Sequence, residues 1–263
     1  MTDRRVALVT GASSGIGRAI AAALGELGWA VAIGARRVDR LEEAAGEVAA
    51  AGGEPFAHHL DVTNPGSVDE FFDAAEDALG AVDVLVNNAG MSVPGEFHRV
   101  GVDDLRREVE TNLLGPMYLS RRAIASMLER GSAGDLVFIS SDATRNARPR
   151  MAAYSATKAG VELLARSLAM ELEGSLVRST VVRVGPTVTE FGFGWDMDVL
   201  QGLMALWPRY GLQRHAGVLD PSAVARAVVF AVTAPPGVHL DTIEVQPEAP
   251  TDEGPARIIE RPS

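Results

Sequence analysis

A tyrosine and a lysine, Tyr154 and Lys158, stand four residues apart in Tyr-Ser-Ala-Thr-Lys. On a helix, this spacing places both side chains on one face. A free phenol has a pKa of roughly 10 and is a poor acid or base at neutral pH. A cation about 4 Å away, at an effective dielectric of about 20, supplies about 4 kcal/mol. That is roughly the energy needed to bring the phenol pKa near 7, so the pair predicts acid–base chemistry with the lysine tuning the tyrosine.

Lys158 is the only lysine among the 24 basic residues of the chain. A Tyr-x3-Lys pair occurs by chance on many helices, but here a chain that uses arginine elsewhere keeps its one lysine beside a tyrosine. The compact ammonium of lysine and the planar fork of arginine are not interchangeable. The position is therefore predicted to need an ammonium group.

A serine, Ser141, precedes Tyr154 by thirteen residues and directly follows the apolar run Leu136–Ser140. In a parallel sheet, the carboxyl ends of the strands form the edge at which ligands bind. A hydroxyl there can donate a hydrogen bond to a developing alkoxide. Ser141 is therefore a candidate for such a donor at this edge of the sheet.

A glycine-rich turn follows the first apolar run, with the sequence Thr10-Gly11-Ala12-Ser13-Ser14-Gly15-Ile16-Gly17. Its Gly-x3-Gly-x-Gly spacing differs from the commoner Gly-x-Gly-x2-Gly fingerprint. The glycines allow a sharp turn and close approach of a ligand, and the helix that follows offers free N–H groups to an anion. We expect a pyrophosphate to bind Gly11, Ser13, Ser14, Gly15, Ile16 and Gly17; the alternative is a turn without a ligand.

The residues that follow the second apolar run indicate which dinucleotide, NAD or NADP, the chain would bind. A carboxylate there would accept hydrogen bonds from the ribose of NAD, but this chain has Arg36 and Arg37, with Arg40 one turn later. Guanidinium groups suit a 2′-phosphate, and a chain of net charge −11 needs a local positive cluster to attract an anionic cofactor. NADP(H) is therefore predicted over NAD(H); the alternative is a solvated helix start.

These side chains need a scaffold, and the chain alternates short apolar runs with longer helical patterns. This alternation predicts an α/β protein: a doubly wound, seven-stranded parallel sheet with helices on both faces. The expected strands are Arg5–Thr10, Ala30–Ala35, Pro55–His59, Val82–Asn87, Asp135–Ser140, Ser179–Val184 and Thr242–Val245. The expected helices are Ile16–Leu27, Val38–Ala51, Ser67–Leu79, Asp103–Arg130, Ala152–Glu173 and Pro221–Ala234.

Composition narrows the class of protein. The 263 residues are 47% hydrophobic and include no cysteine, which excludes disulfides and thiolate sites, and a pI near 4.9 argues against a nucleic-acid module. The five histidines show no ligand spacing, so no metal is predicted. With no signal peptide or spanning segment in the pattern, we expect a soluble cytoplasmic protein. Residues 1–246 are expected to form one domain and 247–263 an acidic, proline-rich tail.

Taken together, these motifs resemble the short-chain dehydrogenase/reductase family, in its compact single-domain subgroup with a Rossmann-type fold. The resemblance runs from Val6 to about Val245. Besides the glycine-rich turn and Ser141, Tyr154 and Lys158, it rests on Asp61-Val62, on Asn87-Asn-Ala-Gly90 and on Asn112.

The resemblance implies a role for each position. Tyr154 would be the general acid/base, Lys158 would lower its pKa and hold the nicotinamide ribose, and Ser141 would orient the carbonyl. Asn112 would hold a water of a proton relay behind Lys158. The remaining cofactor contacts implied are Asp61 and Val62 near the adenine, Asn88, Ala89 and Gly90 along the ribose side, and Thr187 and Thr189 at the nicotinamide carboxamide.

The chain departs from the family pattern at two places near the site. The family usually has Pro-Gly-x3-Thr after the sixth strand, whereas this chain has Val184-Gly185-Pro186-Thr187-Val188-Thr189. Asp142 follows Ser141 where a small neutral residue is commoner, so its charge either disfavours an anionic substrate or points to solvent.

A segment from about 189 to 217 is rich in large apolar residues, including Phe191, Trp195 and Trp207. In the family this stretch forms a flap over the substrate, which suits a hydrophobic ketone or alcohol; the alternative is packing against the body or a neighbouring subunit. Val93, Phe97 and Met151 are expected to add to the pocket wall. Arg145, Arg148 and Arg150 form either a solvated or interface strip or a binding site for an anionic group.

The sequence therefore predicts an NADPH-preferring oxidoreductase that interconverts a ketone or aldehyde and an alcohol on a hydrophobic substrate. The alternatives are a catalytically idle NADP-binding or sensor protein on the same fold, and a related chemistry such as dehydration, epimerisation or double-bond reduction. By resemblance, the helices Asp103–Arg130 and Ala152–Glu173 would form a homodimer or homotetramer.

Overall fold

A computed structural model describes residues 4–212 and 215–249 of the chain. Its core is one seven-stranded sheet in which every neighbouring pair is parallel, in the order β3-β2-β1-β4-β5-β6-β7. The doubly wound α/β prediction is therefore confirmed. The strands are Val6–Thr10 (β1), Ala30–Ala35 (β2), Glu54–His59 (β3), Val84–Asn87 (β4), Gly134–Ser141 (β5), Val177–Val184 (β6) and Thr242–Val245 (β7).

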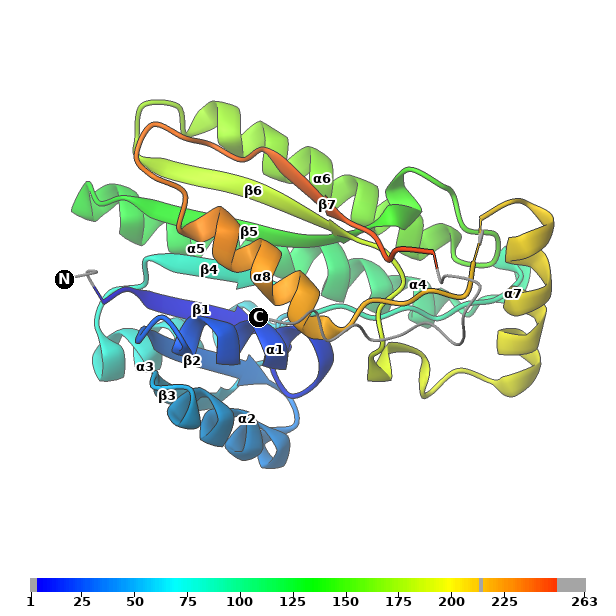
Figure 1. The fold of residues 1–263 in the computed structure, drawn as a ribbon, viewed down its shortest axis with the longest axis horizontal. Coiled ribbons are helices and arrows are strands. Elements are labelled where there is room, and N and C mark those ends of the chain that lie inside the picture. Colours follow the sequence, from blue (N-terminus) through cyan, green and yellow to red (C-terminus); the bar gives the residue numbers. More distant parts are fainter. Residues whose placement is uncertain (1–3, 213–214, 250–263) are drawn as a thin grey trace.

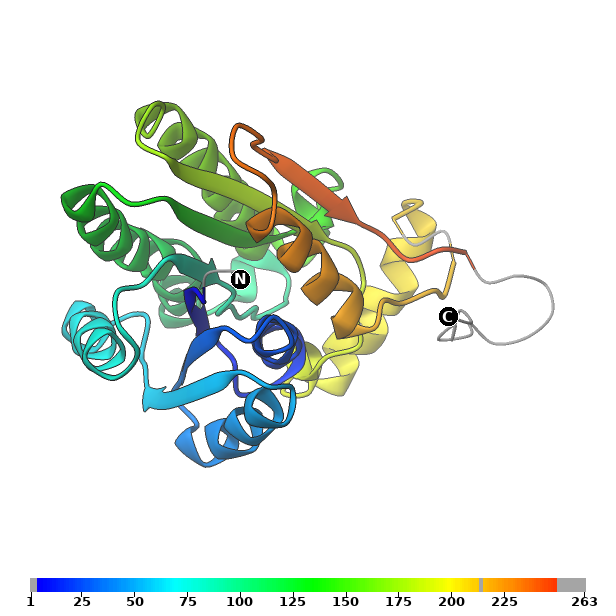
Figure 2. The same cartoon turned by 60° about the vertical axis from the view of Figure 1, so that its left-hand side comes forward.

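Helices cover both faces of this sheet, as Figures 1 and 2 show. α1, α2 and α8 pack on one face, and α3, α5 and α6 on the other. The α-helices are Gly15–Gly25 (α1), Val38–Ala50 (α2), Pro65–Leu79 (α3), Val102–Val109 (α4), Gly115–Arg130 (α5), Ala152–Glu171 (α6), Met197–Arg209 (α7) and Pro221–Val232 (α8). No helix of the described ranges is long and apolar enough to cross a membrane.

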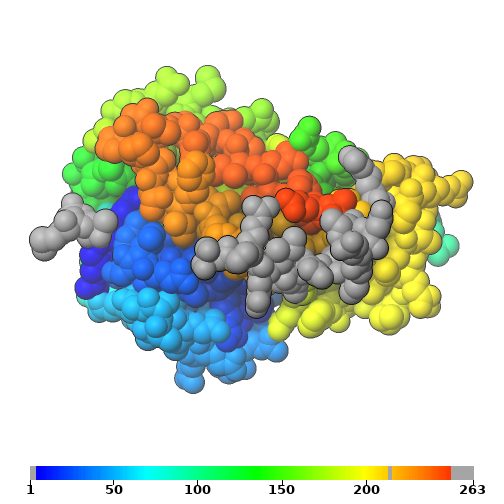
Figure 3. Space-filling model, viewed as in Figure 1, coloured from blue at the N-terminus to red at the C-terminus, as the bar shows by residue number. Residues whose placement is uncertain are grey.

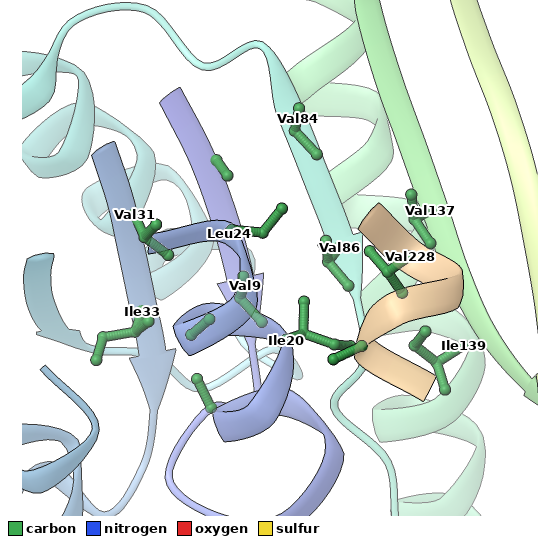
Figure 4. Packing of buried hydrophobic residues seen from close by; sticks show 14 of the residues in the cluster. Val9, Ile20, Leu24, Val31, Ile33, Val84, Val86, Val137, Ile139 and Val228 are labelled. Carbon is green, nitrogen blue, oxygen red and sulfur yellow. The ribbon is translucent and has the colours of Figure 1, made fainter. Parts of the chain in front are cut away.

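Successive side chains of β1 point to opposite faces of the sheet, and both faces are covered by helices, so every residue of the strand is buried. Ala7 and Val9 face α1 and α8, whereas Val6 and Leu8 face the opposite layer, and both sets are buried. Figure 4 shows the first layer, in which Ile20 and Leu24 of α1 and Val228 of α8 meet the valines and isoleucines of the sheet. Burial on both faces makes the sheet rigid and holds its strand ends in fixed positions.

The predicted helix Asp103–Arg130 is wrong as one continuous α-helix. The structure interrupts it with a π-helical turn over Glu110–Leu114, between α4 and α5. Pro116, near the start of α5, has no backbone N–H, so the carbonyl of Asn112 four residues earlier loses its regular helical donor. A π turn of this kind re-aims the side chains it carries, here including Asn112.

The strand order reverses between β1 and β4, since β2 and β3 lie on one side of β1 and β4 to β7 on the other. In doubly wound sheets the loops part at such a point and leave a crevice at the carboxyl edge. The glycine-rich turn after β1 and Asn88 after β4 meet there. α7 lies beyond the same edge, at the right-hand end of Figure 1.

Candidate active site

A cleft of about 790 Å³ opens at the carboxyl edge of the sheet, at this switch point. It runs from the glycine-rich turn and Arg36, past the ends of β4 and β5, to Tyr154 on α6. Its far wall comes from the segment after β6, with Phe191, Trp195 and Trp207. That segment and α7 form the right-hand end of the space-filling view in Figure 3.

The glycine-rich turn has the geometry that its sequence predicts. Gly11 and Gly15 take φ values of +66° and +55°, a left-handed conformation that glycine adopts without strain. A Cβ on Gly17 would lie 2.5 Å from the Gly11 carbonyl oxygen, so only glycine allows this close packing. Because α1 begins at Gly15 and its first residues line the cleft, its free N–H groups lie where helices commonly bind anions.

Asn88 joins the ends of β1 and β4. Its side-chain amide donates to the carbonyl of Thr10 at 2.8 Å, and its backbone N–H donates to the Thr10 hydroxyl at 3.0 Å. The N–H of Ala89 donates to the same hydroxyl at 3.0 Å. These bonds fix the floor of the cleft, in which Asn88, Ala89 and Gly90 are lining residues.

The basic cluster lies where the cleft reaches the end of β2. Arg37 donates to the hydroxyls of Ser13 and Ser14 at 3.0 and 3.1 Å, and Arg36 is exposed on the cleft wall. Asp61 and Val62 also line this end, and the Asp61 carboxylate accepts from the backbone and the hydroxyl of Thr63. The guanidinium groups therefore stand beside the predicted phosphate site.

Tyr154 and Lys158 lie on one face of α6, and both line the cleft. The Lys158 ammonium lies 5.9 Å from the centre of the Tyr154 ring and donates to the carbonyl of Ile139 at 2.8 Å. Lys158 is only 5% exposed. The β5 backbone thus holds the amine in place.

The pKa of Tyr154 in this structure is raised, and not lowered as the pairing with Lys158 predicts. Burial raises the pKa of Tyr154 to about 12, against a smaller lowering by the nearby Ser141 hydroxyl. Burial also lowers the pKa of Lys158 to about 8. Here the desolvation of the phenol outweighs the hydrogen bond from Ser141, so the tyrosine is a protonated phenol at neutral pH.

Ser141 ends β5 beside the Tyr154 phenol, and its hydroxyl accepts from the N–H of Ala143 at 3.2 Å. Its neighbour Asp142 does not point to solvent, so that alternative is wrong. Asp142 pairs with Arg148 at 2.6 Å, and both residues are buried. Burial raises the pKa of Asp142, and the guanidinium opposes this effect.

The pairing also corrects the interpretation of the three arginines as one solvated or interface strip. Arg148 lies over the ring of Trp207 at 5.0 Å and donates to the carbonyl of Leu212 at 2.9 Å. Arg145 instead pairs with Glu244 at 2.8 Å. Of the three, Arg148 alone lines the cleft, where it connects the end of β5 to the segment around α7.

Asn112 lies buried in the π-helical turn, behind the cleft wall. Its side chain accepts from the N–H of Met91 at 2.8 Å and donates to the Met91 carbonyl at 2.8 Å. It also donates to the Thr157 hydroxyl, at 3.2 Å, one residue before Lys158. Asn112 therefore ties the loop after β4 to the helix that carries Tyr154 and Lys158.

Aromatic side chains close the substrate end of the cleft. Phe191 packs on Tyr154 with ring centres 5.4 Å apart, and Trp195 packs on Phe191 at 5.8 Å. The Trp195 indole donates to the Ser92 carbonyl at 3.0 Å, which fastens this segment to the loop after β4. The expected flap over the substrate side thus has an apolar inner wall.

One expected wall residue, Phe97, does not line the cleft and is 61% exposed, whereas Val93 and Met151 line the cleft as predicted. Part of the apolar segment after β6 also faces outward: Phe193 is 82% exposed, and Met197, Met204 and Tyr210 are exposed.

Nearly all predicted site residues meet in this one cleft. The lining includes Gly11, Ser13, Ser14, Gly15, Ile16, Arg36, Arg37, Asp61, Val62, Asn88, Ala89, Gly90, Ser141, Tyr154, Lys158, Thr187 and Thr189. Gly17 and Asn112 lie behind it as packing and bridging residues. Neither the contact of Glu190 with Arg40 nor the burial of Arg148 was predictable from sequence, because each depends on residues that are distant along the chain.

The family model for short chain dehydrogenases matches residues 5–196. A glycine betaine reductase of Emericella nidulans is 36% identical over 244 residues, which are 92% of this chain but only 19% of that protein. The chain therefore spans about a fifth of the length of this relative.

Solved structures agree with the family match. An alcohol dehydrogenase from Thermococcus sibiricus in complex with 5-hydroxy-NADP has a TM-score of 0.80 and 32% identity, over 96% of this chain and all of that one. A short chain dehydrogenase/reductase from Burkholderia phymatum in complex with NAD has a TM-score of 0.78 and 26% identity, over 88% and 86% of the two chains. Family match, sheet order and cleft position lead to one conclusion: the chain is an oxidoreductase of the short-chain dehydrogenase/reductase family.

Proposed function

We propose that this protein is an NADPH-preferring oxidoreductase that interconverts a ketone or aldehyde and an alcohol on a hydrophobic substrate, with Tyr154 as the general acid/base. One observation carries the proposal: Ser141, Tyr154 and Lys158 line the same cleft as the glycine-rich turn and the arginines. The groups proposed to transfer the proton and those proposed to hold the dinucleotide thus line one cleft.

The residues present fit a dinucleotide. The cleft offers the N–H groups of α1, and a Cβ at Gly11 would come within 2.9 Å of the Ala89 backbone, so glycine keeps the turn against the cleft floor. Gly11, Ser13, Ser14, Gly15 and Ile16 would hold the pyrophosphate. A bound nicotinamide would supply or accept the hydride.

Arg36 and Arg37 support the choice of NADP(H), since they bring positive charge beside the phosphate turn. Asp61 lies in the same region, but its carboxylate is occupied by Thr63 and comes after β3, not at the end of β2. Both NADP and NAD derivatives occur in the solved relatives, so the arginines, and not the relatives, carry this part of the proposal.

In the reducing direction, Tyr154 donates its proton to the carbonyl oxygen as negative charge develops there. A phenol with its pKa raised to about 12 is protonated at neutral pH, as a general acid must be. An alkoxide is a stronger base than a phenolate, so the proton transfer is favourable. Ser141 donates to the same oxygen and fixes the carbonyl toward Tyr154.

Lys158 and Asn112 hold this arrangement in place. The Lys158 amine is fixed by the Ile139 carbonyl and would reach the nicotinamide ribose from there. Its positive charge stabilises the phenolate left after proton transfer. Asn112 positions the Met91 backbone and Thr157 around them.

The substrate side is apolar. Val93, Met151, Phe191, Trp195 and Trp207 line this part of the cleft, and the buried Arg148 is neutralised by Asp142. Apolar walls favour a hydrophobic carbonyl compound and exclude water from the hydride-transfer step. The test is NADPH and NADH consumption over a panel of hydrophobic and charged ketones. Turnover of the hydrophobic members with NADPH is expected, and its absence across the panel would refute the proposal.

We also propose that the protein forms a homo-oligomer through α5 and α6. Both helices expose large apolar side chains away from the sheet: Met117 and Leu128 on α5, and Leu163 and Met170 on α6. Paired across a two-fold axis, these faces would bury that surface. The molar mass from light scattering should be that of a dimer or tetramer. Leu163→Asp should lower this mass toward that of the monomer.

A further inference from the structure

A carboxylate from the far wall of the cleft is bonded to the arginine cluster. Glu190 accepts from Arg40 through both carboxylate oxygens at 2.7 Å, and from Arg37 at 3.2 Å. Glu190 lies in the short 3-10 turn Glu190–Gly192, at the beginning of the aromatic segment. One contact therefore joins the end of β2 and the start of α2 to the wall that faces Tyr154.

The contact lies beside the residues that are expected to hold the cofactor phosphates. Glu190 and Arg37 both line the main cleft. Glu190 and Arg40 also line a smaller cavity of about 340 Å³ with Ser13, Ser14 and Gly15, beside the N-terminus of α1. The other terminal nitrogen of Arg37 donates to the hydroxyls of Ser13 and Ser14.

Glu190 is an anion at neutral pH. The hydrogen bonds from Arg40, and then from Arg37, lower the pKa of its carboxyl group. A carboxylate and a phosphate make the same kind of forked, charge-assisted bonds to guanidinium groups. The two anions therefore compete for the same donors.

We propose that Glu190 sets the degree of cofactor discrimination by competing with the 2′-phosphate of NADP(H) for Arg37 and Arg40, an inference that rests on the proposed use of NADP(H). A cofactor with the 2′-phosphate displaces Glu190, and part of its binding energy is spent on breaking the pair. A cofactor without the phosphate leaves Glu190 in place. The preference for NADP(H) is therefore smaller than the two arginines alone would give.

The two residues that flank Glu190 contact the phosphate turn and the acid/base tyrosine. Thr189, the residue before Glu190, lies against the phosphate turn, since a Cβ on Gly15 would be 3.2 Å from its side chain. Phe191, the residue after it, packs on Tyr154. Displacement of Glu190 therefore acts on both the phosphate turn and the aromatic wall over the tyrosine.

The test uses two fragments that carry no nicotinamide, so that catalysis plays no part. Calorimetry measures the Kd of 2′,5′-ADP and of 5′-AMP for wild type and Glu190→Gln. Removal of the competing charge is expected to tighten 2′,5′-ADP by about 3- to 10-fold and to change 5′-AMP by less than about 2-fold. Glu190→Ala should act in the same direction.

Glu43→Gln is the matched control. Glu43 lines the same smaller cavity but pairs with Arg18 at 3.0 Å, so its loss changes the local charge without freeing Arg37 or Arg40. The ratio of the two Kd values should stay within about 2-fold of wild type in this variant.

The outcomes separate the two proposals. If wild type prefers 2′,5′-ADP and Glu190→Gln changes neither Kd, or changes both as Glu43→Gln does, the competition is refuted while the NADPH preference stands. If wild type binds both fragments equally but Glu190→Gln prefers 2′,5′-ADP, the competition stands and the NADPH preference of the wild type is refuted. If neither protein discriminates, both proposals are wrong.

Discussion

The carboxylate of Asp142 and the guanidinium of Arg148 meet at 2.6 Å beside Ser141, with both residues less than a tenth exposed. A buried ion pair is weak evidence for stability as such, but the loss of one partner leaves an uncompensated charge inside the protein. Because Arg148 also stacks on Trp207 and bonds to Leu212, the pair joins β5 to the segment around α7.

Arg148→Met is therefore expected to lower the free energy of unfolding by about 3 to 5 kcal/mol. The double variant Asp142→Ala/Arg148→Met should recover most of that loss, because it leaves no unpaired charge. Arg145→Met is the control: its guanidinium pairs with Glu244 at a largely exposed site, and it should cost less than about 1 kcal/mol. Urea unfolding measures all three, and a double variant as unstable as Arg148→Met would contradict the charge argument.

Tyr154→Phe removes the hydroxyl that would transfer the proton and keeps the ring that packs on Phe191. Turnover should fall by about 10²- to 10⁴-fold, the usual contribution of general acid–base catalysis. The Kd of NADPH should stay within about 2-fold of wild type. Tyr210→Phe, at an exposed phenol beyond the cleft, should keep full turnover. Turnover of Tyr154→Phe near the wild-type rate would exclude Tyr154 as the acid/base.

Lys158 should make the stability of the protein rise with pH in the alkaline range. Its folded-state pKa of about 8 lies below the ordinary 10.5, so between these values the unfolded chain holds a proton that the folded protein has released. Between about pH 7.5 and about pH 9.5, wild type should gain about 2 kcal/mol relative to Lys158→Met.

Tyr154→Phe is the control for this comparison, because it keeps Lys158 and should follow the wild-type curve. Urea unfolding of the cofactor-free proteins at both pH values gives the comparison. An equal pH dependence of wild type and Lys158→Met would show that the buried amine keeps an ordinary pKa.

The parts of the structure that were predictable from sequence are those specified by local pattern. The apolar run Ala30–Ala35 predicts the strand limits that the structure has. A strand that is buried on both faces is a continuous apolar run, so its end is marked by the first polar residue that follows. The glycine-rich turn was predictable for a similar reason: Gly11 and Gly15 need positive φ, and each is specified by its residue type.

The parts that were not predictable depend on contacts between distant residues. The partners Arg40 and Glu190 are 150 residues apart, and nothing local to either one indicates the other. The pKa of Tyr154 depends on how deeply the cleft buries the phenol, which the Tyr-x3-Lys spacing cannot reveal. The π-helical turn falls between these cases: Pro116 marks where regular helix bonding fails, but not how the helix adjusts.

Arg36 gives the most direct test of cofactor choice, because it is exposed on the cleft wall next to Arg37 but is not part of the Glu190 contact. Arg36→Asp replaces a donor for the 2′-phosphate by an anion that repels it and can accept from ribose hydroxyls. The Kd of NADPH should rise by about 10- to 100-fold, and that of NADH should stay the same or fall. Arg106→Asp on α4, an exposed arginine paired with Asp103, makes the same change in net charge and should leave both Kd values nearly unchanged. An unchanged NADPH/NADH ratio in Arg36→Asp would remove Arg36 from the cofactor site and leave the discrimination to Arg37 and Arg40.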